Sequence, residues 1–251
     1  MEQYKLYCDD CINILHKLSD RSIDLIVTDP PYGIEYSTFR THSQRLINDT
    51  NDLEWFADAC KEFSRVLKKG AHIYCFTDIE NSPDFIFALR KNNFKIRNLL
   101  AIPRGIKGVG GSRIFQQQFE YCIFATLGKK REGRNFEQTQ ILKPSESYIK
   151  DKRYPKKEWL YRLPDYWYWT KASVHNSKKK FHPTQKTVSC LENMISLSSK
   201  KDEIVLDPFM GSGSTGVAAL NLDRQFIGIE VDKKYFDIAQ ERISKVGAEH
   251  E

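Results

Sequence analysis

Two prolines hold an acidic and an aromatic side chain directly after a short apolar stretch. The run Ile23–Thr28 is typical of a buried strand, and it leads into Asp29-Pro30-Pro31-Tyr32. Prolines lack an N–H donor and force extended backbone, so the chain can neither continue the strand nor begin a helix here. The carboxylate and the phenol ring are therefore predicted to be fixed at the carboxyl end of a strand, where open α/β sheets bind their ligands.

These groups suit chemistry on an aromatic amine. The exocyclic nitrogen of adenine or cytosine is a poor nucleophile because its lone pair is delocalised into the ring. The carboxylate of Asp29 and the carbonyl of Pro30 could accept its two N–H bonds and pull the nitrogen toward tetrahedral geometry. A base in a duplex must be flipped out to reach such a site, and Tyr32 could then hold it by stacking. An ordinary strand-terminating turn is the alternative for these residues taken alone.

A second motif combines a glycine-rich loop with a downstream acid. The loop reads Asp207-Pro208-Phe209-Met210-Gly211-Ser212-Gly213-Ser214-Thr215-Gly216, and it follows the short predicted strand 203–206. Its glycines have the G-x-G-x-x-G spacing, and Glu230 follows at about the 20-residue distance of the dinucleotide-binding pattern. This combination predicts a site for an adenosine-containing cofactor, whose ribose Glu230 would bind.

The glycine spacing fits either a nicotinamide cofactor or S-adenosylmethionine, because both contain adenosine. A dinucleotide would set its pyrophosphate on the N-terminus of the helix after the loop. Asp207 stands between the strand and the glycines, where its charge would oppose a pyrophosphate and attract the amino group of a methionine moiety. The sequence thus favours S-adenosylmethionine, and a nicotinamide-dependent oxidoreductase is the rival from another class.

The elements that must position these motifs alternate along the chain. Strands are predicted at 4–8, 23–28, 71–76, 94–102, 120–126, 204–206 and 225–229, and helices near 10–18, 54–68, 82–92, 185–198, 214–222 and 233–246. This alternation predicts an α/β fold with a doubly wound, mostly parallel, seven-stranded sheet. Helix 233–246 should cross the sheet and end near strand 4–8. Strand 4–8 should then lie close to strand 225–229, and both termini should lie on one side of the cofactor site.

The alternation fails between about 129 and 180, where the composition changes. This segment has fifteen Lys and Arg against six Asp and Glu, in a chain of 251 residues with a formal net charge of +6. It also contains Trp159, Trp167 and Trp169, three of the four tryptophans. Cations interleaved with aromatic rings can neutralise phosphates and stack on bases, so the segment is predicted to contact nucleic acid; a solvated insertion is the alternative.

The remaining composition argues against several other classes of protein. The six cysteines are Cys8, Cys11, Cys60, Cys75, Cys122 and Cys190. We expect reduced, mostly buried thiols and no metal site, because no second pair follows Cys8 and Cys11 at zinc spacing. No leader pattern and no apolar run of the ~18 residues of a membrane span is seen, which predicts a cytoplasmic protein without membrane contact.

Together these residues resemble the DNA amino-methyltransferases, which make N6-methyladenine or N4-methylcytosine in restriction–modification systems. Asp29–Tyr32 is similar to the family's catalytic motif, 205–213 to its cofactor loop, and His182-Pro183-Thr184-Gln185-Lys186 to a third element. The order of the motifs resembles the beta group, whose target-recognition region is central. The resemblance implies a catalytic half at 1–127, a target-recognition insert at 128–180 and a cofactor-binding half of the same domain at 181–251.

The resemblance also implies roles for individual residues. The catalytic set is Asp29, Pro30, Pro31 and Tyr32. The cofactor-binding set is Asp9, Asp10, His182, Thr184, Lys186, Asp207, Phe209, Met210, Gly211, Ser212, Gly213, Ser214 and Glu230. Asp10, or equally Asp9, would approach the cofactor's adenine, Glu230 its ribose, and His182, Thr184 and Lys186 its methionine end.

The predicted reaction is direct methyl transfer from S-adenosylmethionine to adenine N6 in a flipped base of DNA, without a metal or a covalent enzyme intermediate. The family more often has serine in place of Asp29 for cytosine, so N4-cytosine methylation is the runner-up. A DNA-binding module that has lost catalysis is a third reading. The expected partners are DNA and a cognate restriction endonuclease, and the expected state is a monomer or a homodimer. The chain departs from the family at Thr187, where proline is usual, and at Pro103-Arg104-Gly105, where a tryptophan is common.

Overall fold

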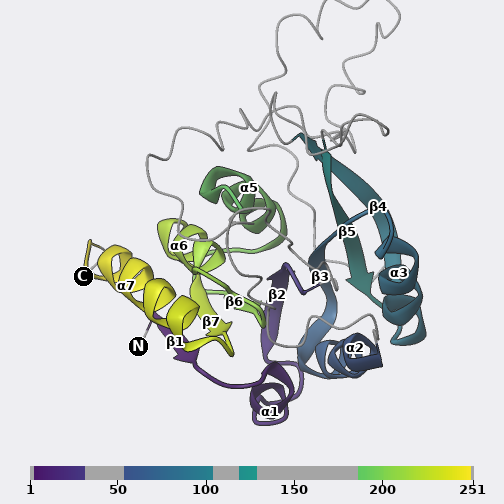
Figure 1. Cartoon of the computed structure of the whole chain (residues 1–251), viewed down its shortest axis with the longest axis horizontal. Coiled ribbons are helices and arrows are strands. Elements are labelled where there is room, and N and C mark those ends of the chain that lie inside the picture. The colour runs from purple at the N-terminus through teal and green to yellow at the C-terminus, as the bar shows by residue number, and fades with distance from the viewer. Residues whose placement is uncertain (1–2, 32–53, 104–118, 129–185, 250–251) are drawn as a thin grey trace, which may run out of the picture.

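A computed structural model describes residues 3–31, 54–103, 119–128 and 186–249. These residues form a seven-stranded sheet with the order β1-β7-β6-β2-β3-β5-β4 (Figure 1). The strands are β1 Tyr4–Tyr7, β2 Ile23–Thr28, β3 Leu67–Thr77, β4 Phe94–Pro103, β5 Phe119–Leu127, β6 Ile204–Asp207 and β7 Gln225–Ile229. All neighbouring pairs are parallel except those that β5 makes with β3 and β4. The predicted α/β fold with a mostly parallel sheet is confirmed.

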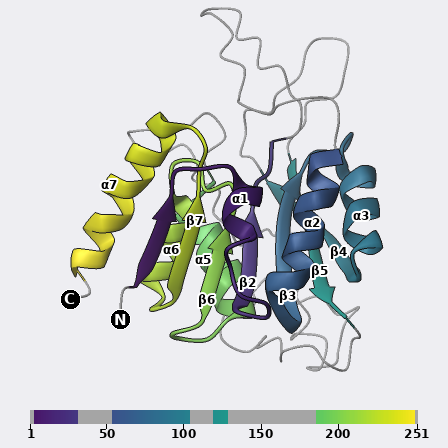
Figure 2. The same ribbon diagram turned by 90° about the horizontal axis from the view of Figure 1, so that it is seen from below.

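Helices cover both faces of this sheet. They are α1 Cys11–Leu15, α2 Glu54–Val66, α3 Ser82–Lys91, α5 Val188–Ser198, α6 Ser214–Asn221 and α7 Lys233–Glu249. One apolar core joins α1, α2 and α3 to the sheet, and a second joins α5, α6 and α7 to the opposite face (Figures 1 and 2). Along β2, Ile26 belongs to the first core while Leu25 and Val27 belong to the second, as the alternation of strand side chains requires. A strand buried on both faces therefore reads as an unbroken apolar run.

The boundaries differ from the predicted ones by three residues or more at four elements. The helix expected at 10–18 ends at Leu15, the helix expected from 185 begins at Val188, and the helix expected to end at 246 continues to Glu249. Strand β3 begins at Leu67 instead of Ala71, directly after the last residue of α2. The charged residues Lys68 and Lys69 interrupt the apolar pattern, so the sequence does not indicate this start. In the structure the Lys68 ammonium lies 2.8 Å from the buried carboxylate of Asp24. No described helix is long and apolar enough to cross a membrane.

The two ends of the described chain meet at one edge of the sheet. Strand β1 pairs directly with β7, with Tyr4 opposite Phe226 and Tyr7 opposite Ile229. At the end of α7, a Cβ added to Gly247 would lie 3.1 Å from the Tyr4 ring, so glycine permits the close approach of helix and strand. The predicted proximity of strand 4–8 to strand 225–229 is confirmed, and Figure 2 shows the end of α7 near the start of β1.

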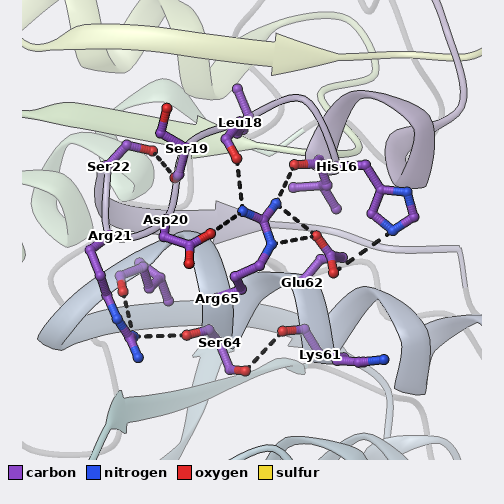
Figure 3. Close-up of polar contacts among 12 residues, drawn as sticks. His16, Leu18, Ser19, Asp20, Arg21, Ser22, Lys61, Glu62, Ser64 and Arg65 are labelled. Atoms are coloured by element: carbon purple, nitrogen blue, oxygen red, sulfur yellow. Dashed lines mark hydrogen bonds and ion pairs between the residues drawn. The ribbon is translucent and has the colours of Figure 1, made fainter.

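An arginine on α2 fixes the chain that follows α1 (Figure 3). The Arg65 guanidinium donates to the carbonyls of Leu15 and Leu18 at 2.7 and 2.8 Å, and it pairs with Asp20 and Glu62 at 2.5 and 2.8 Å. The Leu15 carbonyl also accepts the Leu18 N–H at 3.0 Å, so the guanidinium adds a second donor there and a donor to the carbonyl of Leu18, beyond the end of the helix. This network joins the end of α1 to α2.

Candidate active site

Four acidic residues gather where the parallel strands end. Asp29 follows β2, Asp207 ends β6, Glu230 follows β7, and Asp9 follows β1 by two residues. These four strands are neighbours in the order β1-β7-β6-β2, so their carboxyl ends form one continuous edge. Residues far apart in the sequence are therefore brought to one edge, which is where open α/β sheets bind ligands.

Asp207 is the most deeply buried of these acids. It is 3% exposed, and one of its oxygens accepts the Phe209 backbone N–H at 3.1 Å. Burial is the main cause that raises its pKa to about 7, and the negative charge of Asp29 raises it further. The Thr28 hydroxyl lies close enough to lower this pKa, but its oxygen has no partner of hydrogen-bonding geometry within the described part of the chain. A ligand cation at this point would supply what the buried carboxylate lacks.

The glycines after Asp207 divide into two kinds. A Cβ on Gly213 would lie 2.9 Å from the Ala239 Cβ, and one on Gly216 would lie 2.5 Å from the Ile243 side chain. These two glycines let α6 pack closely against α7. Gly211 has a φ of +51° and nothing within 4 Å of the position of a Cβ, so its backbone lies open at the strand edge. Only this last glycine leaves room for a ligand to approach the backbone.

Glu230 closes the loop from the side of β7. Its carboxylate accepts the backbone N–H of Gly211 at 2.9 Å and that of Asp232 at 2.8 Å. Burial raises its pKa, and these two hydrogen bonds act in the opposite direction. Val231 follows with 39% of its surface exposed, one of few large apolar residues in the described chain to be so open. An acid and an apolar side chain thus stand together beside Gly211, as the ribose and base of an adenosine would require.

The other loop residues of the predicted cofactor set have different surroundings. Met210 is buried, and its sulfur takes up the space that a Cβ at Gly228 would need, so its side chain belongs to the core. Phe209 is half-buried and packs edge-on against Trp55 of α2 with ring centroids 5.6 Å apart. The side chains of Ser212 and Ser214 are buried and face Arg242 of α7.

Arg242 is a residue that sequence reasoning missed. Its guanidinium donates to the Ser212 carbonyl, to the Ser212 hydroxyl at 3.1 Å and to the Ser214 hydroxyl at 3.3 Å. Arg242 therefore holds the glycine-rich loop against α7. In the sequence it is one cation on an amphipathic helix, and nothing in the helical pattern separates it from its solvated neighbours.

The acids after β1 have structural partners as well. Asp10 caps α1 and accepts the Ile12 N–H at 2.9 Å. Asp9 accepts the Asp10 N–H at 2.7 Å and the Asn13 amide at 3.1 Å, and the bond from Asn13 is the main cause that lowers the pKa of Asp9. Both carboxylates are thus held at the strand edge, and the choice between them for an adenine contact stays a prediction.

The catalytic segment is described as far as Pro31. Asp29 is 21% exposed, Pro30 is buried and Pro31 is half-buried. Lys186 approaches from the chain before α5, and its ammonium lies 2.6 Å from Asp29 Oδ2 and 3.6 Å from Glu120 Oε2. The resemblance placed this lysine at the methionine end of the cofactor, whereas the structure sets it against the acid assigned to the substrate. Glu120, at the start of β5, is a second residue that sequence reasoning missed.

Several predicted residues lie outside the described part of the chain. They are Tyr32, His182, Thr184 and nearly all of the insert at 128–180. The division into two halves and an insert therefore stays a prediction, as does the contact of the insert with DNA.

The cysteines show no activated thiol. Five are buried and Cys8 is exposed, and none forms a disulfide. Burial raises the pKa of Cys11 and Cys190 to about 12 and that of Cys75 and Cys122 well above the ordinary range. Within the described residues, no three His, Cys, Asp or Glu side chains are grouped as metal ligands. The charged groups that the structure describes at this edge are carboxylates and the ammonium of Lys186.

Comparison with known proteins agrees with this geometry. A family model described as DNA methylase, covering the N6 and N4 methyltransferases, matches residues 23–241. The type II methyltransferase M.HpaI of Haemophilus parainfluenzae is 30% identical over 95% of this chain and 74% of its own length. The type II methyltransferase M2.MboI of Moraxella bovis is 29% identical over 98% of this chain and 89% of its own length.

Solved structures of methyltransferases have a similar fold. The structure of M1.HpyAVI with S-adenosylmethionine matches with a TM-score of 0.66 and 25% identity over 96% of this chain and 98% of the other. The cytosine-N4-specific PvuII DNA methyltransferase has a TM-score of 0.68 at 16% identity over 99% of this chain and 91% of its own, which shows a shared fold alone. On the match of 23–241 and the acids at the strand edge, the chain belongs to the DNA methylase family of N6 and N4 amino-methyltransferases.

Proposed function

We propose that the protein methylates the N6 amine of adenine in DNA, with S-adenosylmethionine as the methyl donor. The observation that carries this proposal is Asp29, an acid held by two prolines at the strand end next to the one that carries Asp207 and the glycine loop. A substrate acceptor and a cofactor site are thus adjacent, as direct transfer between two bound molecules requires.

The residues at the edge fit the cofactor. Asp207 is a buried carboxylate, and none of the groups that most affect its pKa is a cation. The amino group of a methionine moiety would supply a cation there. Gly211 leaves its backbone open, and Glu230 and Val231 stand beside it for the ribose and the adenine. When bound, the cofactor supplies a methyl group on a cationic sulfur.

On the substrate side, Asp29 and the Pro30 carbonyl accept the N–H bonds of the amine. As the nitrogen attacks, it gains positive charge, and a fixed carboxylate stabilises that charge without reorganising. Burial keeps the thiols of Cys75 and Cys122, on which the charge of Asp29 acts, in their neutral form, so neither of these two is activated as a nucleophile. Tyr32 stacks on the flipped base, by analogy with other enzymes that act on extruded bases.

The choice of adenine rests on the carboxylate at position 29, where the resemblance associates serine with cytosine. N4-cytosine methylation is the competing outcome of the same site. The insert at 128–180 is proposed to bind the DNA, because its fifteen Lys and Arg against six Asp and Glu give it more positive charge than the chain has in total. Both curated relatives described above are type II methyltransferases, so a cognate endonuclease belongs to the proposal.

Expression in a host without its own DNA methylation tests the function. Plasmid DNA digested to nucleosides and analysed by mass spectrometry should contain N6-methyldeoxyadenosine, and modification-sensitive sequencing should give its sequence context. An Asp29→Asn variant is the matched control, since it keeps the shape of the side chain and loses the charge. N4-methyldeoxycytidine would assign the alternative base, and unmodified DNA would refute methyl transfer to DNA in that host.

A further inference from the structure

Lys186 stands between two carboxylates from different strands. Its ammonium lies 2.6 Å from Asp29 Oδ2 at the end of β2 and 3.6 Å from Glu120 Oε2 at the start of β5. Because β5 is antiparallel to β3, its first residues lie at the same edge as the last residues of β2 and β3. The topology of the sheet, and not closeness in sequence, therefore brings the three charges together.

The lysine is well confined in this position. It is 12% exposed, and its ammonium also lies over the Phe76 ring of β3 at 4.7 Å from the centroid, within the range of a cation–π contact. A charge-assisted bond of 2.6 Å at one oxygen limits the rotation of the Asp29 carboxylate. Contacts with residues of β3 and β5 and with the residue after β2 thus fix the orientation of the Asp29 carboxylate, the acid assigned to the substrate.

We propose that Lys186 is a positioning residue for Asp29, not a ligand for the methionine end of the cofactor, and that Glu120 is the second anion that holds it there. This inference rests on the methyl-transfer function proposed above. Because Glu120 shares the ammonium, Asp29 keeps more of the negative charge that meets an amine turning cationic.

The charges around Asp29 make the proposal testable. Among the described residues, Asp207 faces it from β6, Lys186 from the chain before α5 and Glu120 from β5, and the buried thiols of Cys75 and Cys122 are neutral. Removing the ammonium should raise the pKa of Asp29, and removing the Glu120 charge while the ammonium stays should lower it. A merely structural role would not move the pKa in opposite directions.

The first measurement needs no activity. Carbon-13 NMR of labelled aspartate carboxyls in the full-length chain gives the Asp29 pKa, with the resonance assigned through Asp29→Asn. We expect Lys186→Met to raise it by about 1–3 units, Lys186→Arg to keep it near the wild-type value, and Glu120→Gln to lower it. An unchanged pKa in Lys186→Met overturns the role of the lysine, and an unchanged pKa in Glu120→Gln overturns that of the glutamate. Urea unfolding of each variant shows whether it is folded. If Lys186→Met does not fold, the Asp29 pKa in Lys186→Arg and Glu120→Gln still tests the proposal.

The second measurement separates the two sites of the proposed function. Single-turnover methylation by Lys186→Met should show its acid limb at higher pH, while S-adenosylmethionine affinity, measured by calorimetry, stays within about twofold. A tenfold loss of cofactor affinity with an unmoved acid limb would return Lys186 to the cofactor. If the wild-type protein methylates no DNA, the proposed function fails, and the NMR result still decides whether the three charges act on one another.

Discussion

Asp29 and Asp207 are carboxylates at the ends of neighbouring strands, yet they have opposite surroundings. Asp207 is 3% exposed, its pKa is raised to about 7 chiefly by burial, and the groups that act most strongly on it include no cation. Asp29 is 21% exposed and has the Lys186 ammonium at 2.6 Å. The comparison teaches that one acid carries its own counter-charge, while the other is left for a cation that arrives with a ligand. The first is suited to a neutral amine and the second to the amino group of S-adenosylmethionine.

The largest effect should come from the acid assigned to the substrate. Asp29→Ala should lower the single-turnover rate of methyl transfer by about 100- to 1000-fold or more, by analogy with the removal of one oxyanion-hole donor. S-adenosylmethionine affinity, measured by calorimetry, should change little, because Asp207 and Glu230 remain. Normal activity of this variant at saturating DNA and cofactor would show that the two acids are not divided as we describe.

The acid assigned to the cofactor should make binding depend on pH. Above pH 7 Asp207 is ionised and ready for a cation, so S-adenosylmethionine affinity should be nearly constant. Below pH 7 binding must first remove the proton, so the affinity should fall by up to about tenfold per pH unit. Isothermal titration between pH 5.5 and 8.5 measures this, and Asp207→Asn should bind weakly with a flat profile. A wild-type profile as flat as that of the variant would contradict the assignment.

The same carboxylate should lower the stability of the cofactor-free protein as the pH rises. Its pKa is near 3.8 when unfolded and about 7 when folded, so the folded state binds the additional proton between these values. The free energy of unfolding should therefore fall from about pH 4 to pH 7 and then level off. Asp207→Asn should remove this fall and stabilise the apoprotein at pH 8, on the order of 1–4 kcal/mol in urea unfolding. A variant less stable than the wild type at pH 8 would count against it.

The smallest effect per residue should come from cations of the predicted insert. Replacing Lys178, Lys179 and Lys180 by alanine should reduce the slope of log affinity for DNA against log salt by up to about 0.9 for each phosphate that the variant no longer neutralises. S-adenosylmethionine affinity should not respond, since these lysines belong to the predicted insert. Fluorescence anisotropy of labelled DNA at several salt concentrations measures the slope, and Lys200 and Lys201, on the chain before β6, provide a control pair. Equal slopes for the triple variant and the wild type would remove these lysines from the DNA interface.

Local patterns in the sequence determined much of this protein. The apolar runs located all seven strands, because a strand buried on both faces is predominantly apolar; β2, which is buried throughout, has Asp24 as its one charged residue. The prolines after Asp29 and the glycine spacing after Asp207 marked both acids, since each feature imposes its backbone shape within a few residues. The sequence did not distinguish the roles of the predicted loop residues. The structure does, because the side chains of Met210 and Phe209 pack on other side chains, whereas the backbone of Gly211 lies open.

Only the tertiary structure decided which distant charges meet. Lys186 pairs with Asp29 and Glu120 because the order of the strands and the reversed direction of β5 bring their ends together. Arg242 reaches the loop because Gly213 and Gly216 let α7 lie close to α6. Periodicity reports how a residue relates to its own helix or strand, whereas an ion pair depends on the distance between elements, which no local pattern contains. Position 29 could therefore be identified from its motif, but its counter-charge could not.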